Sequence, residues 1–189
     1  MTGRRDEVLD AAVEVVGSGG LRRLTYRAVD TAAGVPAGTT SNHFRSRDSL
    51  VQGVVAHLEA LDRRDWEAFG GQPAPAGPDE LAAAVARTVR HFLGPGRTRL
   101  TARYALLLEG IARPAVREPL ARANASLTHW GARWLRELGS PAPEEHCEVL
   151  MDYLDGLMLH RVTMERADFD PEPGIRTVLS GFLPPPESR

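Results

Sequence analysis

The chain has 189 residues, of which 42% are hydrophobic and 25% charged, with a formal net charge of −2. This composition is ordinary for a globular chain that can bury a core, and the charge argues against a protein coated in nucleic acid. The absence of a run of about 18 apolar residues excludes a membrane-spanning helix. No apolar segment follows the first arginines, so we expect no signal peptide. The single cysteine, Cys147, excludes an intrachain disulfide, and together these absences favour a cytoplasmic protein.

The N-terminal segment predicts two helices separated by glycines. Apolar residues recur at helical spacing over residues 4–17, and the glycines of GSGG at 17–20 are expected to end that helix. Thr25 is a candidate N-cap for a short helix, Tyr26–Ala33. Gly34 supplies the stop signal that follows it.

Two further helices are expected before the clearest break in the chain. A short one should span about Pro36–Phe44, because proline suits the first turn of a helix, where its missing N–H would be unpaired in any case. A longer one should span Ser46–Phe69, with Ser49 completing a weak cap at its start. The segment GGQPAPAGP at 70–78 then reads as a loop.

The remainder of the chain also predicts helices. Their expected ranges are 79–93, about 100–112, 114 to about 138 with a kink at Pro119, 144–166 and 171–183. Strand patterns, internal repeats and phosphate-binding glycine motifs are absent from the sequence. We therefore predict an all-α fold.

The two short helices and the turn at Gly34 match a helix–turn–helix pattern. Val35 would fill the angle between them, and Phe44 would anchor the second helix to the core. The outward residues are then small or carry hydroxyl and amide groups that can bond to base edges: Ala37, Gly38, Thr39, Ser41 and Asn42. Arg45 and Arg47 follow, where phosphates flank a major groove. The alternative is an ordinary helical hairpin, but so short a helix makes a poor scaffold.

The segment LTYRAVDTAAGVPAGTTSNHFRSRDSLV, Leu24–Val51, closely resembles the DNA-binding domain of the TetR family of bacterial transcriptional regulators. The family pattern is a Thr-capped helix followed roughly by A-x-x-A-G-V-S-x-G-x-x-Y-x-H-F-x-S-K-x-x-L. The matches are Ala33-Gly34-Val35, Gly38, His43-Phe44, Ser46, Arg47 in place of Lys, and Leu50.

The resemblance implies roles for individual residues. Tyr26 and Arg27 fall where the second helix of the family contacts backbone phosphates, and Arg47 falls where a basic residue at the start of the fourth helix meets another. Ala37, Gly38, Thr39, Ser41 and Asn42 fall on the recognition helix. Ser41 departs from the tyrosine usual in the family, so we expect that contact to be weaker or replaced, and Pro36 in place of serine is expected to be harmless.

The resemblance further implies two domains and a homodimer. Residues 1–47 would form the helix–turn–helix DNA-binding domain, and 48–189 a helical ligand-binding and dimerisation domain. One short recognition helix reads few base pairs, so two related by a two-fold axis should bind a palindromic operator. The family dimerises through its last two long helices, which here supply the expected interface: Gly156, Leu157, His160, Met164, Ile175, Val178, Leu179 and Phe182. The alternative is that these residues form intrachain core.

The resemblance also implies a pocket for a small-molecule effector among the central helices. The candidate lining consists of aromatic and flexible apolar residues: Phe92, Tyr104, Leu107, Trp130, Trp134, Met151 and Met158. His91, Glu109, His129 and Asp155 are candidate polar contacts. Each of these residues could instead be core filler or a satisfied surface group. An effector that fits one arrangement of the core better would shift the population toward it and displace the 46–69 helix. The distance between the two recognition helices of the dimer would then change.

We weigh two other classes of protein. An enzyme is disfavoured because His146 and Cys147 are adjacent on a helix and so face different directions, and no other catalytic or metal-ligand spacing occurs. We expect neither cofactor nor metal. A DNA-binding regulator controlled by a protein partner stays open. The favoured function is a repressor that binds double-stranded operator DNA as a homodimer and is released by a small molecule.

Overall fold

The computed structural model describes residues 3–70, 74–164 and 169–184. Within these residues the chain forms helices and no strand, which confirms the all-α prediction. The first helices are α1 (Arg4–Gly19), the 3-10 helix η1 (Leu21–Arg23), α2 (Tyr26–Ala33), α3 (Thr39–His43) and α4 (Arg47–Gly70). The others are α5 (Pro78–Leu93), α6 (Arg97–Gly110), α7 (Pro114–Glu137), α8 (Pro143–Thr163) and α9 (Glu172–Ser180). None of the helices so described is both long and apolar enough to cross a membrane.

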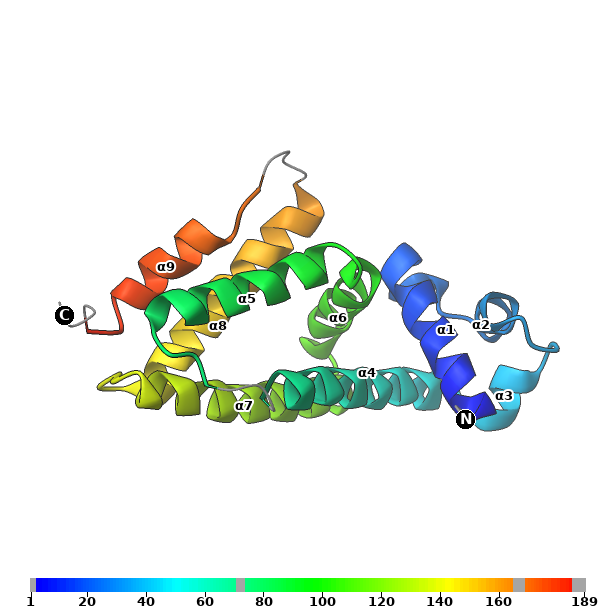
Figure 1. Ribbon diagram of the computed structural model, residues 1–189. Coiled ribbons are helices and arrows are strands. Elements are labelled where there is room, and N and C mark those ends of the chain that lie inside the picture. The colour runs from blue at the N-terminus through cyan, green and yellow to red at the C-terminus, as the bar shows by residue number, and fades with distance from the viewer. Residues whose placement is uncertain (1–2, 71–73, 165–168, 185–189) are drawn as a thin grey trace. The chain divides into compact units, whose positions relative to one another are not determined.

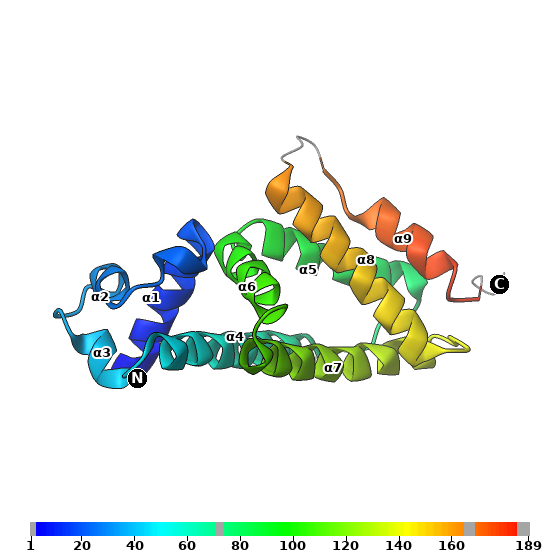
Figure 2. The same cartoon turned by 180° about the vertical axis from the view of Figure 1, so that it is seen from behind.

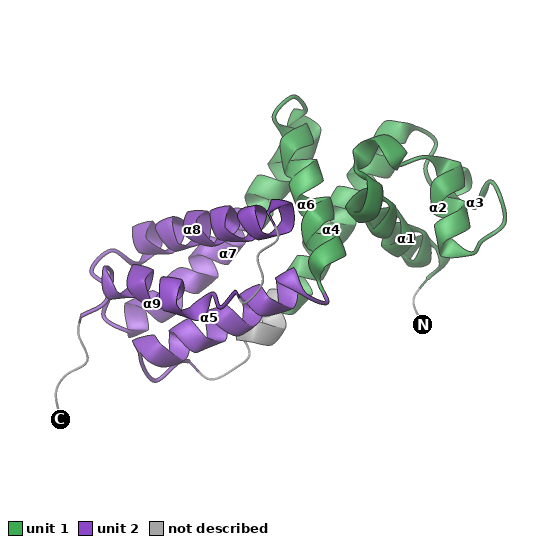
Figure 3. Ribbon diagram, turned by 90° about the horizontal axis from the view of Figure 1, so that it is seen from above, with its two compact units in different colours: residues 1–66, 96–123 green, residues 67–95, 124–189 purple. Residues whose placement is uncertain are grey.

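The chain divides into two compact units, shown in green and purple in Figure 3. Unit 1 comprises residues 1–66 and 96–123, and unit 2 comprises residues 67–95 and 124–189. The predicted division after residue 47 does not coincide with this boundary. The reason is that the apolar face of α4 and one face of α6 are buried in the same core as α1.

Unit 1 is organised around α1, which packs against α2, α3 and α6. Its core joins buried side chains of α1, such as Leu9 and Val16, to Leu50 and Leu58 of α4 and Leu106 of α6. The crossing of α1 and α6 is so close that a Cβ atom on residue 17 would overlap the carbonyl oxygen of Thr98. Glycine is therefore needed there for packing. The segment from α1 to α3 thus rests on a core to which later helices contribute.

Local capping signals account for both ends of α2 and for the start of α4. The hydroxyl of Thr25 accepts a hydrogen bond from the Ala28 N–H at 3.2 Å, and Gly34, with φ +63°, ends α2, as expected. Ser46 and Ser49 exchange two 3.1 Å hydrogen bonds, each backbone N–H donating to the other hydroxyl, which confirms the predicted cap of α4.

The start of α3 differs from the prediction. We expected this helix to begin at Pro36, but Pro36–Gly38 forms a turn and α3 begins at Thr39. Gly38 has φ +92°, which a right-handed helix excludes. The helix is therefore only five residues long, and its position depends on contacts made by the turn before it.

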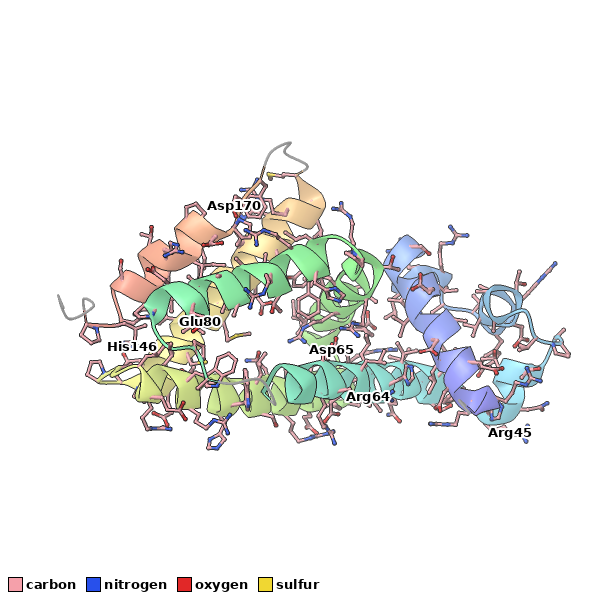
Figure 4. All side chains as sticks on the ribbon, viewed as in Figure 1. Arg45, Arg64, Asp65, Glu80, His146 and Asp170 are labelled. Atoms are coloured by element: carbon pink, nitrogen blue, oxygen red, sulfur yellow. The ribbon has the colours of Figure 1, made fainter. Side chains whose placement is uncertain are left out.

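Unit 2 contains α5, the C-terminal part of α7, α8 and α9. α5 packs against both α8 and α9, and Figure 3 shows it beside α9. Two exposed ion pairs connect α5 to the α9 region. Arg90, in the last turn of α5, pairs with Asp170 at 2.7 Å, and Asp79, in its first turn, pairs with Arg176. Figure 4 shows Asp170 just before α9, near the C-terminal end of α5. Pro119, where we predicted a kink, lies inside α7, which the structure describes as one helix.

Candidate nucleic-acid interface

The helix–turn–helix is formed by α2 and α3, which pack on each other and on α1 (Figures 1 and 2). Phe44, directly after α3, is 4% exposed and is the anchor that the sequence predicted. Its ring occupies the space beside Gly53 of α4, where a Cβ atom would lie 2.5 Å from the ring carbon Cε1. Phe44 therefore fixes the C-terminal end of α3 to α4.

The N-terminal end of α3 is held by Asp30 of α2, a residue that our sequence reasoning missed. Its carboxylate is 4% exposed and accepts three hydrogen bonds. The Gly38 N–H donates to Oδ2 at 2.8 Å, while the Thr40 N–H at 2.8 Å and the Thr40 hydroxyl at 2.5 Å both donate to Oδ1. The first alanine of the family pattern falls at this position, so an acid there was a signal that could have been noticed.

The balance of forces on Asp30 keeps it ionised. Burial disfavours the charged carboxylate, but the hydrogen bonds from Thr40 and Gly38 outweigh that effect and hold the pKa of Asp30 below its usual range. Thr40 itself is fully buried. The carboxylate therefore acts as a permanent anionic acceptor behind α3 at neutral pH.

The residues expected to face outward differ in exposure. Ala37 and Asn42 are exposed, whereas Gly38, Thr39 and Ser41 are half-buried. The Thr39 hydroxyl donates to the Pro36 carbonyl at 2.6 Å, and the Ser41 hydroxyl donates to the Gly38 carbonyl at 2.9 Å. Both hydroxyl protons are thus engaged within the chain, and each oxygen keeps its capacity to accept a hydrogen bond.

Exposed arginines surround this motif. Arg27 on α2 and Arg45 after α3 are exposed, and Figure 4 shows Arg45 extending away from the helices. Arg47 is also exposed, but one of its guanidinium nitrogens donates to the Leu21 carbonyl at 2.9 Å and ties the start of α4 to η1. η1 adds two exposed arginines that the sequence reasoning did not select, Arg22 and Arg23. Tyr26, the remaining predicted contact, is half-buried and packs against the core.

Buried polar groups tie α4 to the rest of unit 1. His57 is buried, and its Nε2 lies 2.6 Å from Oδ1 of Asp10 on α1. Asp62 is also buried and accepts a 2.7 Å hydrogen bond from Arg103 of α6. Burial raises the pKa of the Asp62 carboxyl above its usual range, although the positive charges of Arg103 and Arg99 favour ionisation. The helix that follows the reading head is therefore held to α1 and α6 by directional contacts.

Two family models match the chain. Residues 8–54 match the bacterial regulatory proteins of the tetR family, and residues 76–185 match the tetracyclin repressor-like C-terminal domain. The chain belongs to the TetR family. The predicted family is confirmed, and with it the prediction of a DNA-binding transcriptional regulator that is not an enzyme.

Individual TetR-family proteins are similar over nearly the whole chain. The HTH-type transcriptional repressor KstR2 of Rhodococcus jostii is 27% identical over 191 residues, covering 82% of this chain and 92% of that protein. A family member from Streptomyces coelicolor A3 is 29% identical, with a TM-score of 0.72 over 97% of this chain and 100% of that chain. The multidrug binding protein EbrR, solved in complex with ethidium, is 28% identical with the same TM-score and the same coverage.

The residues predicted for the dimer interface of this TetR-family chain fall into three groups by exposure. Gly156, His160 and Met164 on or just after α8 are exposed, and a Cβ atom on Gly156 would meet nothing within 4 Å. Leu157, Val178 and Phe182 are half-buried, and the Phe182 ring stacks on His146 with centroids 4.5 Å apart. Ile175 and Leu179, by contrast, are 0% and 1% exposed in the single chain. These two must be corrected, because they fill the core of unit 2 and have no surface left to give a partner.

The residues predicted to line an effector pocket are divided between the units. Phe92, Trp130, Trp134, Met151 and Met158 belong to unit 2, where all are buried or half-buried, and Tyr104 and Leu107 belong to unit 1. Leu107 is 38% exposed. The rings of Trp130 and Trp134 lie 4.5 Å apart at 59°.

Unit 2 also contains a half-open pocket of about 310 Å³ that includes none of the predicted ligand residues. Its lining is Pro78, Asp79, Arg176, Leu179, Ser180, Leu183 and Pro184.

Burial raises the pKa of Cys147 to about 11, so this thiol stays protonated at neutral pH.

Proposed function

We propose that this TetR-family chain is a cytoplasmic repressor that binds a palindromic operator as a homodimer and is released by a small molecule. The observation that carries the proposal is the presentation of α3. This helix is fixed at its start by Asp30 and just after its end by Phe44, while Ala37 and Asn42 stay exposed beside a group of arginines. A short helix held in this way, with small residues outward, can enter a major groove.

The hydrogen bonds of α3 limit which base groups it can read. Thr39 and Ser41 donate their hydroxyl protons to carbonyls of their own chain, so toward DNA they act as acceptors. The acceptors match the amino groups of adenine and cytosine in the major groove. Asn42 has an exposed carboxamide that both donates and accepts, which suits adenine. We therefore expect operator half-sites in which Asn42 has the largest single effect on base preference.

Dimerisation is supported by exposed apolar side chains on α8. Val149 and Leu159 are 48% and 44% exposed, and Gly156 lies between them at a spacing that puts all three on one side of the helix. The buried residues of α8, such as Leu150 and Leu154, form a separate stripe. Glu145 and Asp152 are exposed on the same side, so this surface is mixed, with apolar side chains that a partner helix could cover. The sequence analysis selected Gly156, Leu157, His160 and Met164 in this region and did not select Val149 or Leu159.

An effector site in unit 2 is supported by the neighbouring rings of Trp130, which is half-buried, and Trp134, which is buried. The similarity to EbrR, a multidrug binding protein complexed with ethidium, also supports it. Ethidium is an aromatic cation, and aromatic side chains bind such ligands by stacking and by cation–π attraction. We propose that the effector of this chain is likewise a largely apolar molecule with an aromatic system. A ligand with different affinities for the two states would shift the population away from the DNA-binding one.

The test is selection of bound sequences from random double-stranded DNA by the purified chain. The reading-head variant is Thr39→Ala/Asn42→Ala, and Asn124→Ala, which removes an exposed carboxamide from α7, serves as the matched control. We expect the unaltered chain and the control to select one palindrome and the double variant to lose it. Addition of ethidium as a probe should then reduce operator binding. Selection of no sequence by the unaltered chain would contradict the proposed function, and an operator whose binding no small aromatic probe alters would favour control by a protein partner.

A further inference from the structure

The contact between α2 and the start of α3 uses a buried charge where the family pattern uses alanine. In the pattern quoted above, the first alanine falls at the place of Asp30. Alanine at that place shows that a carboxylate is not needed to form the helix–turn–helix. In this chain the carboxylate is 4% exposed and has three donors, all from Gly38 and Thr40. Asp30 therefore has a role that the fold alone does not require.

The geometry shows what the carboxylate determines. An ionised carboxylate is costly to bury unless strong hydrogen bonds compensate it, and such bonds are short and directional. Here the distances are 2.5–2.8 Å and both oxygens are used. Since the donors belong to the N-cap residue of α3 and to its second residue, any displacement or rotation of α3 would break at least one bond. A packing contact with alanine would tolerate such a movement far better.

The same bonds change how α3 can meet DNA. The N-terminus of a helix commonly binds a phosphate through its free N–H groups. In α3 the N–H groups of Gly38 and Thr40 donate to Asp30, and its negative charge opposes the approach of a phosphate. Phosphate contacts must then come from side chains such as Arg27 and Arg45, which are exposed. α3 is left to contact base edges.

We propose that Asp30 is a positioning residue that sets DNA sequence preference by fixing the start of α3, an inference that rests on the proposed function. Asp30 raises the affinity for the operator relative to other DNA without touching DNA itself. Its negative charge at the same time lowers the affinity for DNA of any sequence. Loss of the carboxylate should therefore lower the affinity for the operator but not the affinity for other DNA. A residue that merely stabilises the fold would lower both affinities when it is replaced.

The deciding experiment measures the affinity of Asp30→Asn for the selected operator and for a scrambled duplex at the same salt concentration. Asparagine offers one acceptor oxygen in place of two, so at least one of the three donors loses its partner. We expect operator affinity to fall about tenfold or more, while affinity for the scrambled duplex stays equal or rises. The matched control is Asp48→Asn, which removes an exposed carboxylate from the first turn of α4. It should leave the ratio of the two affinities unchanged.

A second variant keeps the test valid if Asp30→Asn does not fold. Asp30→Ala/Thr40→Val removes both the carboxylate and the hydroxyl, so no buried charge is left unpaired, and circular dichroism should show a folded chain. We expect its selected sequences to be broader than those of the unaltered chain. An unchanged preference in this folded variant, or equal losses for both duplexes in Asp30→Asn, would overturn the inference while the proposed function stands. If the unaltered chain prefers no sequence, both are overturned.

Discussion

Unit 1 and unit 2 are stabilised by different kinds of contact. Among the described residues, buried polar side chains are concentrated in unit 1, where Asp30, Thr40, His57 and Asp62 each have a partner at hydrogen-bond distance. In unit 2 the ion pairs between α5 and α9 are exposed, and the core is apolar apart from Ser140, whose hydroxyl lies 2.7 Å from Nδ1 of His146. Directional buried bonds define one arrangement, whereas apolar packing admits several of similar energy. A reading head needs the first property, and a site that responds to a ligand benefits from the second.

The largest expected effect comes from removing the anchor of α3. Phe44→Ala should lower the free energy of unfolding by about 3–5 kcal/mol, because a fully packed ring is lost beside Gly53. Urea unfolding followed by circular dichroism measures it. Phe92→Ala, which truncates a half-buried ring in unit 2, is the control and should cost less. Equal losses would show that the reading head is no more rigidly packed than unit 2.

Gly38→Ala should have the next largest effect. Gly38 has φ +92°, so a Cβ atom there should cost about 1–2 kcal/mol of stability although the space around it is open. The strain falls on the turn that donates to Asp30, so operator affinity should fall as well. Thermal unfolding and DNA binding of the same sample check both effects. An unchanged thermal midpoint would mean that the turn can adopt another conformation.

Gly156→Ala should act in the opposite direction on the single chain. Gly156 is helical and exposed with open space around its Cβ position, so alanine should stabilise α8 by about 0.5–1 kcal/mol. If the partner helix approaches closely at this face, the same methyl group should weaken the dimer. Sedimentation velocity over a range of concentrations separates the two effects. A dimer as strong as that of the unaltered chain would place the interface elsewhere.

A smaller effect should follow acidification. The pKa of Asp30 is lowered in the folded chain, so its ionisation contributes stability that is present above the unfolded pKa, near 3.8, and is lost as the pH falls through the lower folded value. The stability difference between the unaltered chain and Asp30→Asn should therefore be constant near neutral pH and shrink below about pH 4. Urea unfolding at several pH values tests this. A difference that grows on acidification would contradict the sign.

The smallest effect is expected at the exposed ion pairs of unit 2. Arg176→Gln removes the contacts of Arg176 with Asp79 and Glu172, but water and salt screen these charges. The thermal midpoint should not change measurably, at low or at physiological salt. A clear loss at low salt alone would show that these pairs act as a network.

Features that depend on neighbouring residues were predictable from the sequence alone. Thr25 and Gly34 predicted both ends of α2, and Ser46 and Ser49 predicted the cap of α4. These signals act through backbone hydrogen bonds that close over three or four residues. They can therefore be read without knowing which helices meet.

Tertiary structure decided what depends on residues far apart in the chain. Proline favoured a helix start at Pro36, but the carboxylate of Asp30, on another helix, captures the Gly38 N–H and moves the start to Thr39. Likewise, Leu179 and Leu159 are the same residue type on neighbouring C-terminal helices, yet one is 1% and the other 44% exposed. Burial depends on which helix packs against each face, and a hydrogen bond between helices depends on their approach. Only the folded chain brings those groups together.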